Sequence, residues 1–211
     1  MYDTLFFDLD NTLYPADSGL WEAIGERIES YLKDEMKMQA NEIAEFRITC
    51  REKYGTTLQG LKKMYQVNEA HYLQYVHAVN LSDYLHPEDQ LAALLDSLPQ
   101  RKIILTNSDI NHAHNVLSFL EIEHFFEFII DVNQLSPYVK PQKESFSKAL
   151  QLAKLNTSAG CVFMDDHLPS VQNAAEMGFL GIFVGQDAES QYPYQIADIY
   201  GLPEILSQVL Q

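Results

Sequence analysis

The chain has 211 residues, of which 46% are apolar, and its 14 basic and 30 acidic residues give a net charge of −16. This acidic balance argues against a protein that binds the backbone of DNA or RNA, because such a protein needs a basic stripe. A small phosphorylated ligand is not excluded, since one bound cation and one lysine reverse the charge locally.

Five short apolar segments are predicted to be buried strands. In chain order they cover residues 4–7, 102–105, 126–130, 161–164 and 180–184. Amphipathic stretches of helical length lie between the later strands, at residues 111–120, 143–155 and 170–177. Strands that alternate with helices in this way predict an α/β fold, with a parallel sheet covered by helices on both faces.

The connection after the first strand is different, because it is long and contains no convincing strand. Four helices are predicted within it, at residues 19–33, 41–53, 58–64 and 69–80. We therefore expect an all-helical domain over residues 15–86, inserted into a core domain made of residues 1–14 and 87–211.

Polar residues follow four of the predicted strands at the point where each ends. Asp8 and Asp10 follow the first strand, and the second is followed by Thr106, Asn107 and Ser108. The loop after the third strand carries Lys140, and the fourth strand is followed by Asp165 and Asp166. Ligands of open α/β sheets bind at the carboxyl ends of the strands, so these residues are expected to form one site.

The acidic residues of this site indicate a metal ion. Asp8 and Asp10 are two residues apart on an extended segment, so their carboxylates point the same way. Two carboxylates at about 4 Å repel each other by roughly 1 to 4 kcal/mol, and a cation removes this cost. Oxygen ligands favour Mg²⁺ over zinc. A carboxylate beside Mg²⁺ and Lys140 is a plausible nucleophile towards a phosphoryl group, and a second carboxylate can transfer a proton.

Four segments together resemble the haloacid dehalogenase superfamily of phosphohydrolases: FDLDNTLY, ILTNS, Lys140 before a helix, and VFMDD. The resemblance spans essentially the whole chain and implies a Rossmann-like core with a helical, C1-type cap. It also implies that Asp8 is the nucleophile that becomes an aspartyl phosphate, and that Asp10 is the general acid and base. Mg²⁺ would be held by Asp8, by the main-chain carbonyl of Asp10 and by Asp166, with Asp165 supporting these ligands. The phosphoryl oxygens would be bound by Thr106, Asn107 and Lys140.

One feature departs from the pattern of this superfamily. Many members carry a further aspartate after the fourth strand, where this chain has His167, followed by Ser170 and Asn173. The adjacent pair of Asp165 and Asp166 can serve the metal without it, so we do not interpret the departure as a loss of activity.

Three longer stretches resemble the pyrimidine 5′-nucleotidase branch of the superfamily: FDLDNTLYP, YGTTLQGL and TNSDINHAHNVLSFLEI. This finer resemblance implies a nucleoside monophosphate as substrate. Further substrate contacts are expected from Tyr14 beneath the inserted domain, from Ser108, and from Gly55, Thr56 and Thr57 at a helix break. Six other histidines, His112 among them, are expected to be structural or exposed.

Several alternative functions remain open at this point. They are a phosphatase for another small phosphate (a sugar phosphate or pyridoxal phosphate), a phosphomutase, a 2-haloacid dehalogenase and a catalytically idle binding module. Asp10 argues against the dehalogenase, because a leaving halide needs no proton. The complete set of site residues argues against the idle module.

The cysteines and the apolar runs predict where the protein resides. Cys50 and Cys161 have neither the spacing of a metal site nor that of a disulfide framework. An acid at Asp3 argues against a signal peptide, and the apolar runs are too short to cross a bilayer. We therefore expect a cytoplasmic protein with no membrane partner.

Overall fold

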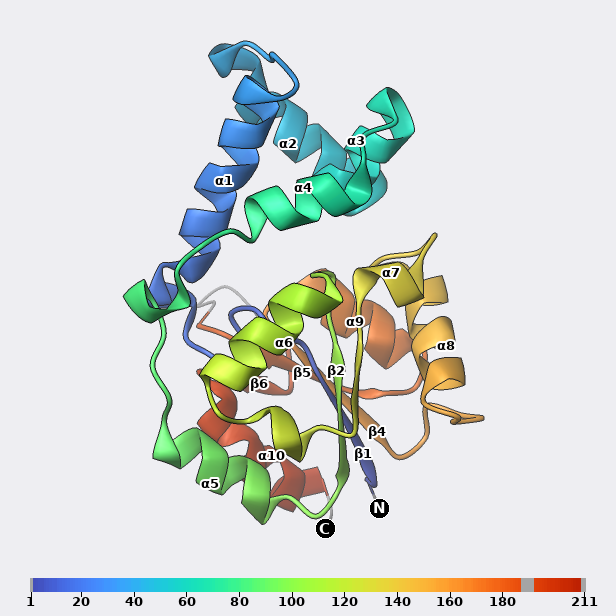
Figure 1. Cartoon of the computed structure of the whole chain (residues 1–211). Coiled ribbons are helices and arrows are strands. Elements are labelled where there is room, and N and C mark those ends of the chain that lie inside the picture. Colours follow the sequence, from blue (N-terminus) through green and yellow to red (C-terminus); the bar gives the residue numbers. More distant parts are fainter. Residues whose placement is uncertain (1, 187–191, 210–211) are drawn as a thin grey trace. The chain divides into compact units, whose positions relative to one another are not determined.

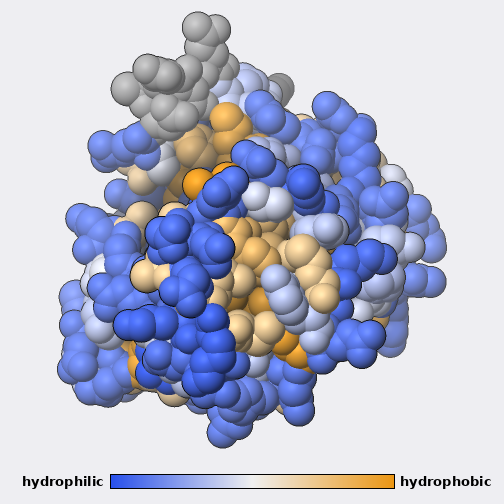
Figure 2. Space-filling view, turned by 90° about the horizontal axis from the view of Figure 1, so that it is seen from above, coloured by the Kyte–Doolittle hydropathy of each residue, from blue (hydrophilic) through white to orange (hydrophobic). Residues whose placement is uncertain are grey.

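The computed structural model describes residues 2–186 and 192–209, and the chain divides into two compact units. The first, called the core unit below, comprises Met1–Ser18 and Leu85–Gln211. The second, called the helical unit, is Gly19–Tyr84. Most of the surface seen in Figure 2 is hydrophilic, in keeping with the strong net charge.

The core unit is built on a six-stranded sheet in the order β3-β2-β1-β4-β5-β6 (Figure 1). The strands are β1 (Thr4–Phe7), β2 (Arg101–Leu105), β3 (Phe128–Ile130), β4 (Cys161–Asp165), β5 (Leu180–Val184) and β6 (Gln195–Ile196). All five pairings are parallel. The chain runs outwards from β1 to β2 and β3 and then returns to the other side of β1 at β4, so the order reverses between β1 and β4.

Helices cover both faces of this sheet, which confirms the predicted Rossmann-like fold (Figure 1). They are α5 (Asp89–Ser97), α6 (Ile110–Phe119), α7 (Val132–Leu135), α8 (Lys143–Leu152), α9 (Leu168–Glu176) and α10 (Leu202–Val209). The sequence predicted α6, α8 and α9. It did not predict α5, α7, α10 or the short strand β6.

The packing of the core explains why the strand sequences are continuous runs of apolar residues. Phe6 of β1 and Phe163 of β4 are fully buried and pack with Phe146 of α8 and Val171 of α9. The rings of Phe146 and Phe163 meet edge to face at 5.1 Å between centroids. Burying each such side chain contributes about 1.5 to 3 kcal/mol. This packing fixes where β1 and β4 end, and therefore where the polar residues that follow them lie.

The helical unit lies in the sequence between β1 and β2 and contains no strand in any of its residues, all of which the structure describes. Its helices are α1 (Leu20–Asp34), α2 (Ala40–Tyr54), α3 (Thr57–Tyr65) and α4 (Glu69–Val76), followed by the 3-10 turn η2 (Leu81–Asp83). Tyr31 packs edge to face against Tyr72, at 4.9 Å between ring centroids. Helices α2 and α3 approach so closely that a Cβ on Gly60 would lie 2.2 Å from the sulfur of Cys50.

Cys50 and Cys161 are both buried and unpaired by any disulfide. In the part of the chain covered by residues 2–186 and 192–209, none of the helices combines the length and the apolar character that a membrane span requires.

Candidate active site

The carboxyl ends of β1 and β4 bring Asp8 and Asp165 together. These strands are neighbours in register, with Phe7 opposite Met164, and the main-chain N–H of Asp8 donates to the carbonyl of Met164 at 2.9 Å. Both carboxylates are buried. They lie at the carboxyl ends of β1 and β4, the two strands between which the strand order reverses, and this is the expected binding place in an open α/β sheet.

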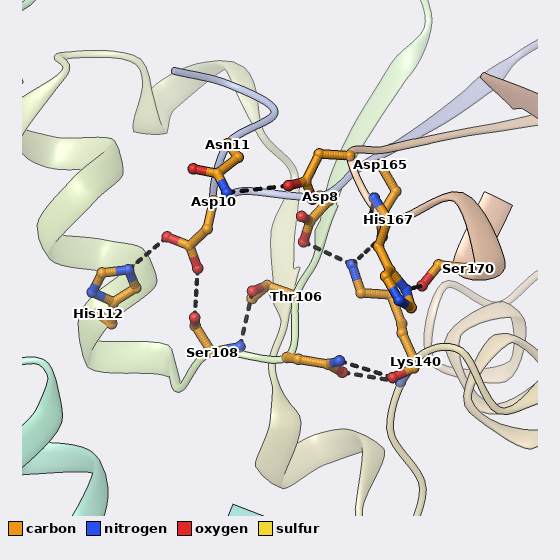
Figure 3. A network of polar contacts seen from close by, with 12 residues as sticks. Asp8, Asp10, Asn11, Thr106, Ser108, His112, Lys140, Asp165, His167 and Ser170 are labelled. Carbon is orange, nitrogen blue, oxygen red and sulfur yellow. Dashed lines mark hydrogen bonds and ion pairs between the residues drawn. The ribbon is translucent and has the colours of Figure 1, made fainter. Parts of the chain in front are cut away.

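Asp8, Asp165 and Asp166 form an acidic cluster in which one oxygen of each lies within 4.8 Å of the others. Lys140 reaches the cluster from the loop before α8. Its Nζ donates to Oδ1 of Asp8 and to Oδ2 of Asp165, both at 2.7 Å (Figure 3). The cluster therefore holds three carboxylates against one ammonium group.

The pKa values of these groups show that Lys140 alone does not balance the charge. Burial, together with the nearby Asp165 and Asp10, raises the pKa of Asp8 to about 7, in spite of Lys140. Burial and the charge of Asp8 raise the pKa of Asp166 to about 6. Burial alone would lower the pKa of Lys140, but Asp165 and Asp8 raise it above its ordinary value, so the lysine stays charged.

A divalent cation fits this cluster. All three donors are carboxylates, and two further positive charges would offset the excess of negative charge left beside Lys140. Oxygen ligands of this kind suit a hard cation such as Mg²⁺. Within the described residues, no other group of three or more acidic, histidine or cysteine ligands comes as close together.

Two asparagines hold the loop that carries Lys140. The side-chain amide of Asn107 donates to the carbonyl of Lys140 at 2.9 Å, and the N–H of Lys140 donates back to Oδ1 of Asn107 at 3.0 Å. Asn173, in α9, donates to the carbonyl of Pro141 at 3.0 Å. The side chain of Asn107, predicted to contact substrate, is thus engaged with Lys140. A phosphoryl contact of this residue would fall to its main-chain N–H.

Thr106 lies where it was predicted, at the end of β2, and is fully buried. Its hydroxyl oxygen accepts from the main-chain N–H of Ser108 at 2.9 Å. A hydroxyl that accepts one bond can still donate its hydrogen, so Thr106 is able to bond to a phosphoryl oxygen.

The carboxylate of Asp10 is not part of the acidic cluster and is held by donors of its own, among them Ser108 and His112 (Figure 3). Its Oδ1 accepts from the hydroxyl of Tyr14 and from Nε2 of His112, both at 2.8 Å, and its Oδ2 accepts from the hydroxyl of Ser108 at 2.6 Å. Burial would raise the pKa of Asp10, but His112 and these hydrogen bonds bring it below its usual range. Tyr14 and Ser108, both predicted to bind substrate, contact Asp10 instead in this structure.

Two residues of the site were not singled out by the sequence. His112 is buried and contacts Asp10 from the first turn of α6, a helix that begins directly after the residues at the end of β2. Its place in that first turn was the available signal. Asn11 has a positive φ of 59° and donates to Oδ2 of Asp166 at 3.1 Å. Asparagine tolerates this left-handed conformation better than most residues.

The position that departs from the superfamily pattern is part of the same network. The N–H of His167 donates to Oδ1 of Asp165 at 2.7 Å, and its Nδ1 lies 2.9 Å from the hydroxyl of Ser170. The main chain of His167 thus helps to orient Asp165, and this contact does not depend on the histidine side chain.

The predicted substrate contacts of the helical unit have local structural roles. Gly55 ends α2 with a φ of 86°. Thr56 caps α3, with its hydroxyl accepting from the N–H of Gln59 at 3.1 Å, and Thr57 is buried. A contact of these residues with substrate stays a prediction.

A family model described as haloacid dehalogenase-like hydrolase matches residues 2–178. The chain belongs to this family. Phosphate metabolism protein 8 of Saccharomyces cerevisiae is 29% identical over 189 residues. These cover 82% of this chain and 58% of that protein, so the chain spans less than two thirds of the length of this relative.

Solved structures of the family share the fold. L-2-haloacid dehalogenase from Xanthobacter autotrophicus, with chloropropionic acid covalently bound, is 15% identical with a TM-score of 0.61, over 98% of this chain and 99% of that one. YfnB from Bacillus subtilis, bound to magnesium, is 19% identical with a TM-score of 0.61, over 98% and 99% of the two chains. The family model thus confirms the predicted superfamily, and these structures share its fold.

Proposed function

We propose that this hydrolase is a Mg²⁺-dependent phosphomonoesterase that acts on a small phosphorylated metabolite through an aspartyl phosphate on Asp8. The observation that carries the proposal is the placement of two carboxylates with different surroundings at the end of β1. Asp8 lies between Lys140 and the acidic cluster, whereas Asp10 lies in a separate set of hydrogen-bond donors.

In the first half of the reaction, the carboxylate of Asp8 attacks phosphorus. The bond between phosphorus and the leaving oxygen breaks, and the leaving oxygen takes a proton from Asp10. The contacts of Asp10 with His112, Ser108 and Tyr14 lower its pKa. The negative charge of an incoming phosphate raises that pKa and favours uptake of the proton that Asp10 then delivers.

In the second half, water attacks the phosphorus of the aspartyl phosphate. The bond from phosphorus to the oxygen of Asp8 breaks, the carboxylate of Asp8 is restored, and Asp10 accepts the proton of the water. In this proposal the phosphoryl oxygens are bound by Thr106, by the main-chain N–H of Asn107 and by Lys140. Because Lys140 stays charged, it favours the ionised form of Asp8 and attracts the phosphate.

The proposed metal ligands are Asp8, Asp166 and the main-chain carbonyl of Asp10, with Asp165 in support. When bound, Mg²⁺ would supply positive charge to the phosphoryl group and lower the pKa of Asp8. The carboxylate donor set supports this assignment, as does the presence of magnesium in the structure of YfnB.

The alternative of a 2-haloacid dehalogenase is less well supported. The fold does not separate the two activities, since the dehalogenase from Xanthobacter autotrophicus has the same fold. Halide, however, leaves without a proton, and a dehalogenase would have no need of a second carboxylate. In this chain a second carboxylate, that of Asp10, is buried two residues after Asp8 and is held in place by three hydrogen bonds.

We propose a nucleoside monophosphate as substrate, and a pyrimidine 5′-nucleotidase as the specific activity. The sequence stretches around Asp8, Gly55 and Thr106 support this substrate, and the name of the yeast relative is consistent with the release of phosphate. Selectivity for the base or sugar would come from the helical unit, since the core residues bind only the phosphoryl group common to all candidates.

A panel of substrates tests the proposal. Purified protein with Mg²⁺ would be given nucleoside monophosphates, sugar phosphates, pyridoxal phosphate and 2-chloropropionate, with release of phosphate and of chloride measured in parallel. We expect phosphate release that is fastest with pyrimidine nucleotides, and no chloride. Chloride release without phosphate release would contradict the proposed chemistry, and a sugar phosphate as best substrate would contradict only the proposed specificity.

A further inference from the structure

Three donors hold the carboxylate of Asp10, and they come from two separate segments of the chain. Tyr14 lies four residues further along the same loop, whereas Ser108 and His112 follow β2. His112 is 2% exposed, and its Nε2 must donate, because the carboxylate oxygen that it contacts can only accept. The carboxylate of Asp10 thus accepts three hydrogen bonds from side chains of two different segments.

The position of His112 is itself fixed by its helix. Asp109 is the N-cap of α6, and its carboxylate accepts from the main-chain N–H of Asn111 at 2.9 Å and of His112 at 3.3 Å. The backbone of His112 is therefore anchored at the helix start, while its ring reaches Asp10 across 102 residues of sequence.

The contacts with Tyr14, Ser108 and His112 restrict the direction from which the carboxylate of Asp10 can accept a proton. An ionised carboxylate has about four acceptor positions. Among the described residues, two donors occupy Oδ1 and one occupies Oδ2, which leaves one acceptor position on Oδ2. A carboxylate held in this way has a fixed orientation, which is what a general base needs in order to accept a proton from one particular water.

We propose that His112 is a positioning residue, which orients Asp10 to activate the water that hydrolyses the aspartyl phosphate on Asp8. This role deepens the proposed function and rests on it. His112 acts through Asp10 and contacts neither the substrate nor the reacting water. Its loss therefore affects the second half of the reaction, in which Asp10 accepts a proton, whatever the leaving group of the first half.

4-Nitrophenyl phosphate separates the two halves, because its leaving group departs without a proton. For this substrate, kcat/KM reports the formation of the aspartyl phosphate, and kcat reports its hydrolysis when that step is slow. In His112→Leu with Mg²⁺ we expect kcat to fall by about tenfold to 100-fold, since misplacement by about 1 Å costs up to 100-fold. We expect kcat/KM to stay within about threefold of wild type. Rapid mixing should then show a burst close to one 4-nitrophenolate per enzyme.

Two matched variants accompany this measurement. His112→Gln keeps an N–H donor at a similar reach without the ring, and should recover most of the lost kcat. His114→Leu changes a histidine of the same helix whose exposed ring pairs with Glu123 at 2.6 Å, and should leave both constants unchanged. Should His112→Leu fail to fold, Ser108→Ala removes the donor on the other oxygen of Asp10 and should also lower kcat more than kcat/KM.

The outcomes are distinct. If kcat and kcat/KM fall together in both the leucine and the glutamine variants, His112 has only a structural role and the inference is wrong. It is also wrong if neither constant changes. If wild-type protein with Mg²⁺ releases no 4-nitrophenol at all, the proposed function fails, and the role of His112 falls with it.

Discussion

Buried polar side chains are distributed very unevenly between the core unit and the helical unit. In the core unit, Asp8, Asp10 and Lys140 are buried and bonded to one another or to other polar side chains. In the helical unit, whose residues are all described, Tyr31 and Tyr72 are buried in the core, and apart from them Thr57 is the one buried polar side chain. Thr56 and Asn68, which are less buried, cap α3 and α4.

The difference indicates which of the two units carries the catalytic residues. Buried charges are costly unless they are paired, so a fold that keeps several of them at one point gains something other than stability. The core unit has this property and the helical unit does not. Four predictions test the contrast, from the largest expected effect to the smallest.

The largest effect is expected from Asp8→Asn, which removes the nucleophile at nearly constant volume. Hydrolysis of 4-nitrophenyl phosphate should fall by at least about 1,000-fold. The unfolding temperature should stay within about 4 °C of wild type, because the change also removes one charge from a crowded acidic cluster.

The matched variant in the helical unit is Glu29→Gln, which removes an exposed carboxylate paired with Arg47 and should leave activity unchanged. Turnover of Asp8→Asn within tenfold of wild type, in a preparation free of other phosphatases, would contradict the assignment of Asp8.

Removal of divalent cations should abolish phosphatase activity, and added Mg²⁺ should restore this activity. Mg²⁺ should also raise the unfolding temperature independently of activity, since a ligand at 100 times its dissociation constant stabilises the folded state by about 2.7 kcal/mol. Asp166→Asn should lose most of this thermal shift. Full activity in excess chelator would mean that the acidic cluster serves another purpose.

Lys140→Met should destabilise the protein by about 3 kcal/mol, because it leaves the carboxylates of Asp8 and Asp165 buried without their cation. Added Mg²⁺ should recover part of this loss. The comparison in the helical unit is Lys62→Met, which breaks a pair with Glu69 in which both side chains are more than a quarter exposed. This second change should cost no more than about 1 kcal/mol. If denaturant titrations show the same loss of stability for Lys140→Met and Lys62→Met, the proposed difference between the two units is wrong.

The smallest effect concerns selectivity. If Thr56 or Thr57 contacts the base or sugar, Thr56→Val or Thr57→Val should lower activity on the best nucleotide by about twofold to tenfold, with hydrolysis of 4-nitrophenyl phosphate spared. Thr56 also caps α3, so its loss costs about 1 kcal/mol of stability on its own account.

The matched control for this capping role is Thr56→Ser, which keeps the capping hydroxyl and should retain both activities. If nucleotide and aryl phosphate fall equally in the valine variants, these residues act on folding. If neither falls, the nucleotide proposal loses its main support.

The sequence predicted five of the six strands of the sheet and most of the acidic site. The bounds of β1 and β5 follow from uninterrupted apolar runs, which occur because both faces of a parallel sheet are covered. Asp8, Asp165 and Asp166 could be predicted to meet, because the carboxyl ends of parallel strands share one edge. The sequence was less informative about element ends. The fourth helix was predicted to reach residue 80 and ends at Val76, and the two residues of β6 are too few to give a pattern.

Only the tertiary structure decided which polar groups contact each other. Lys140 and Asp8 are 132 residues apart, and His112 and Asp10 are 102 apart, so no local pattern links them. The strand order places β2 and β4 on either side of β1, and this order brings the start of α6 to Asp10 and the acids at the end of β4 to Asp8. Periodicity in a sequence reports which side of an element is buried. The contacts within the buried site depend on which elements are neighbours, and that is fixed by packing over the whole sheet.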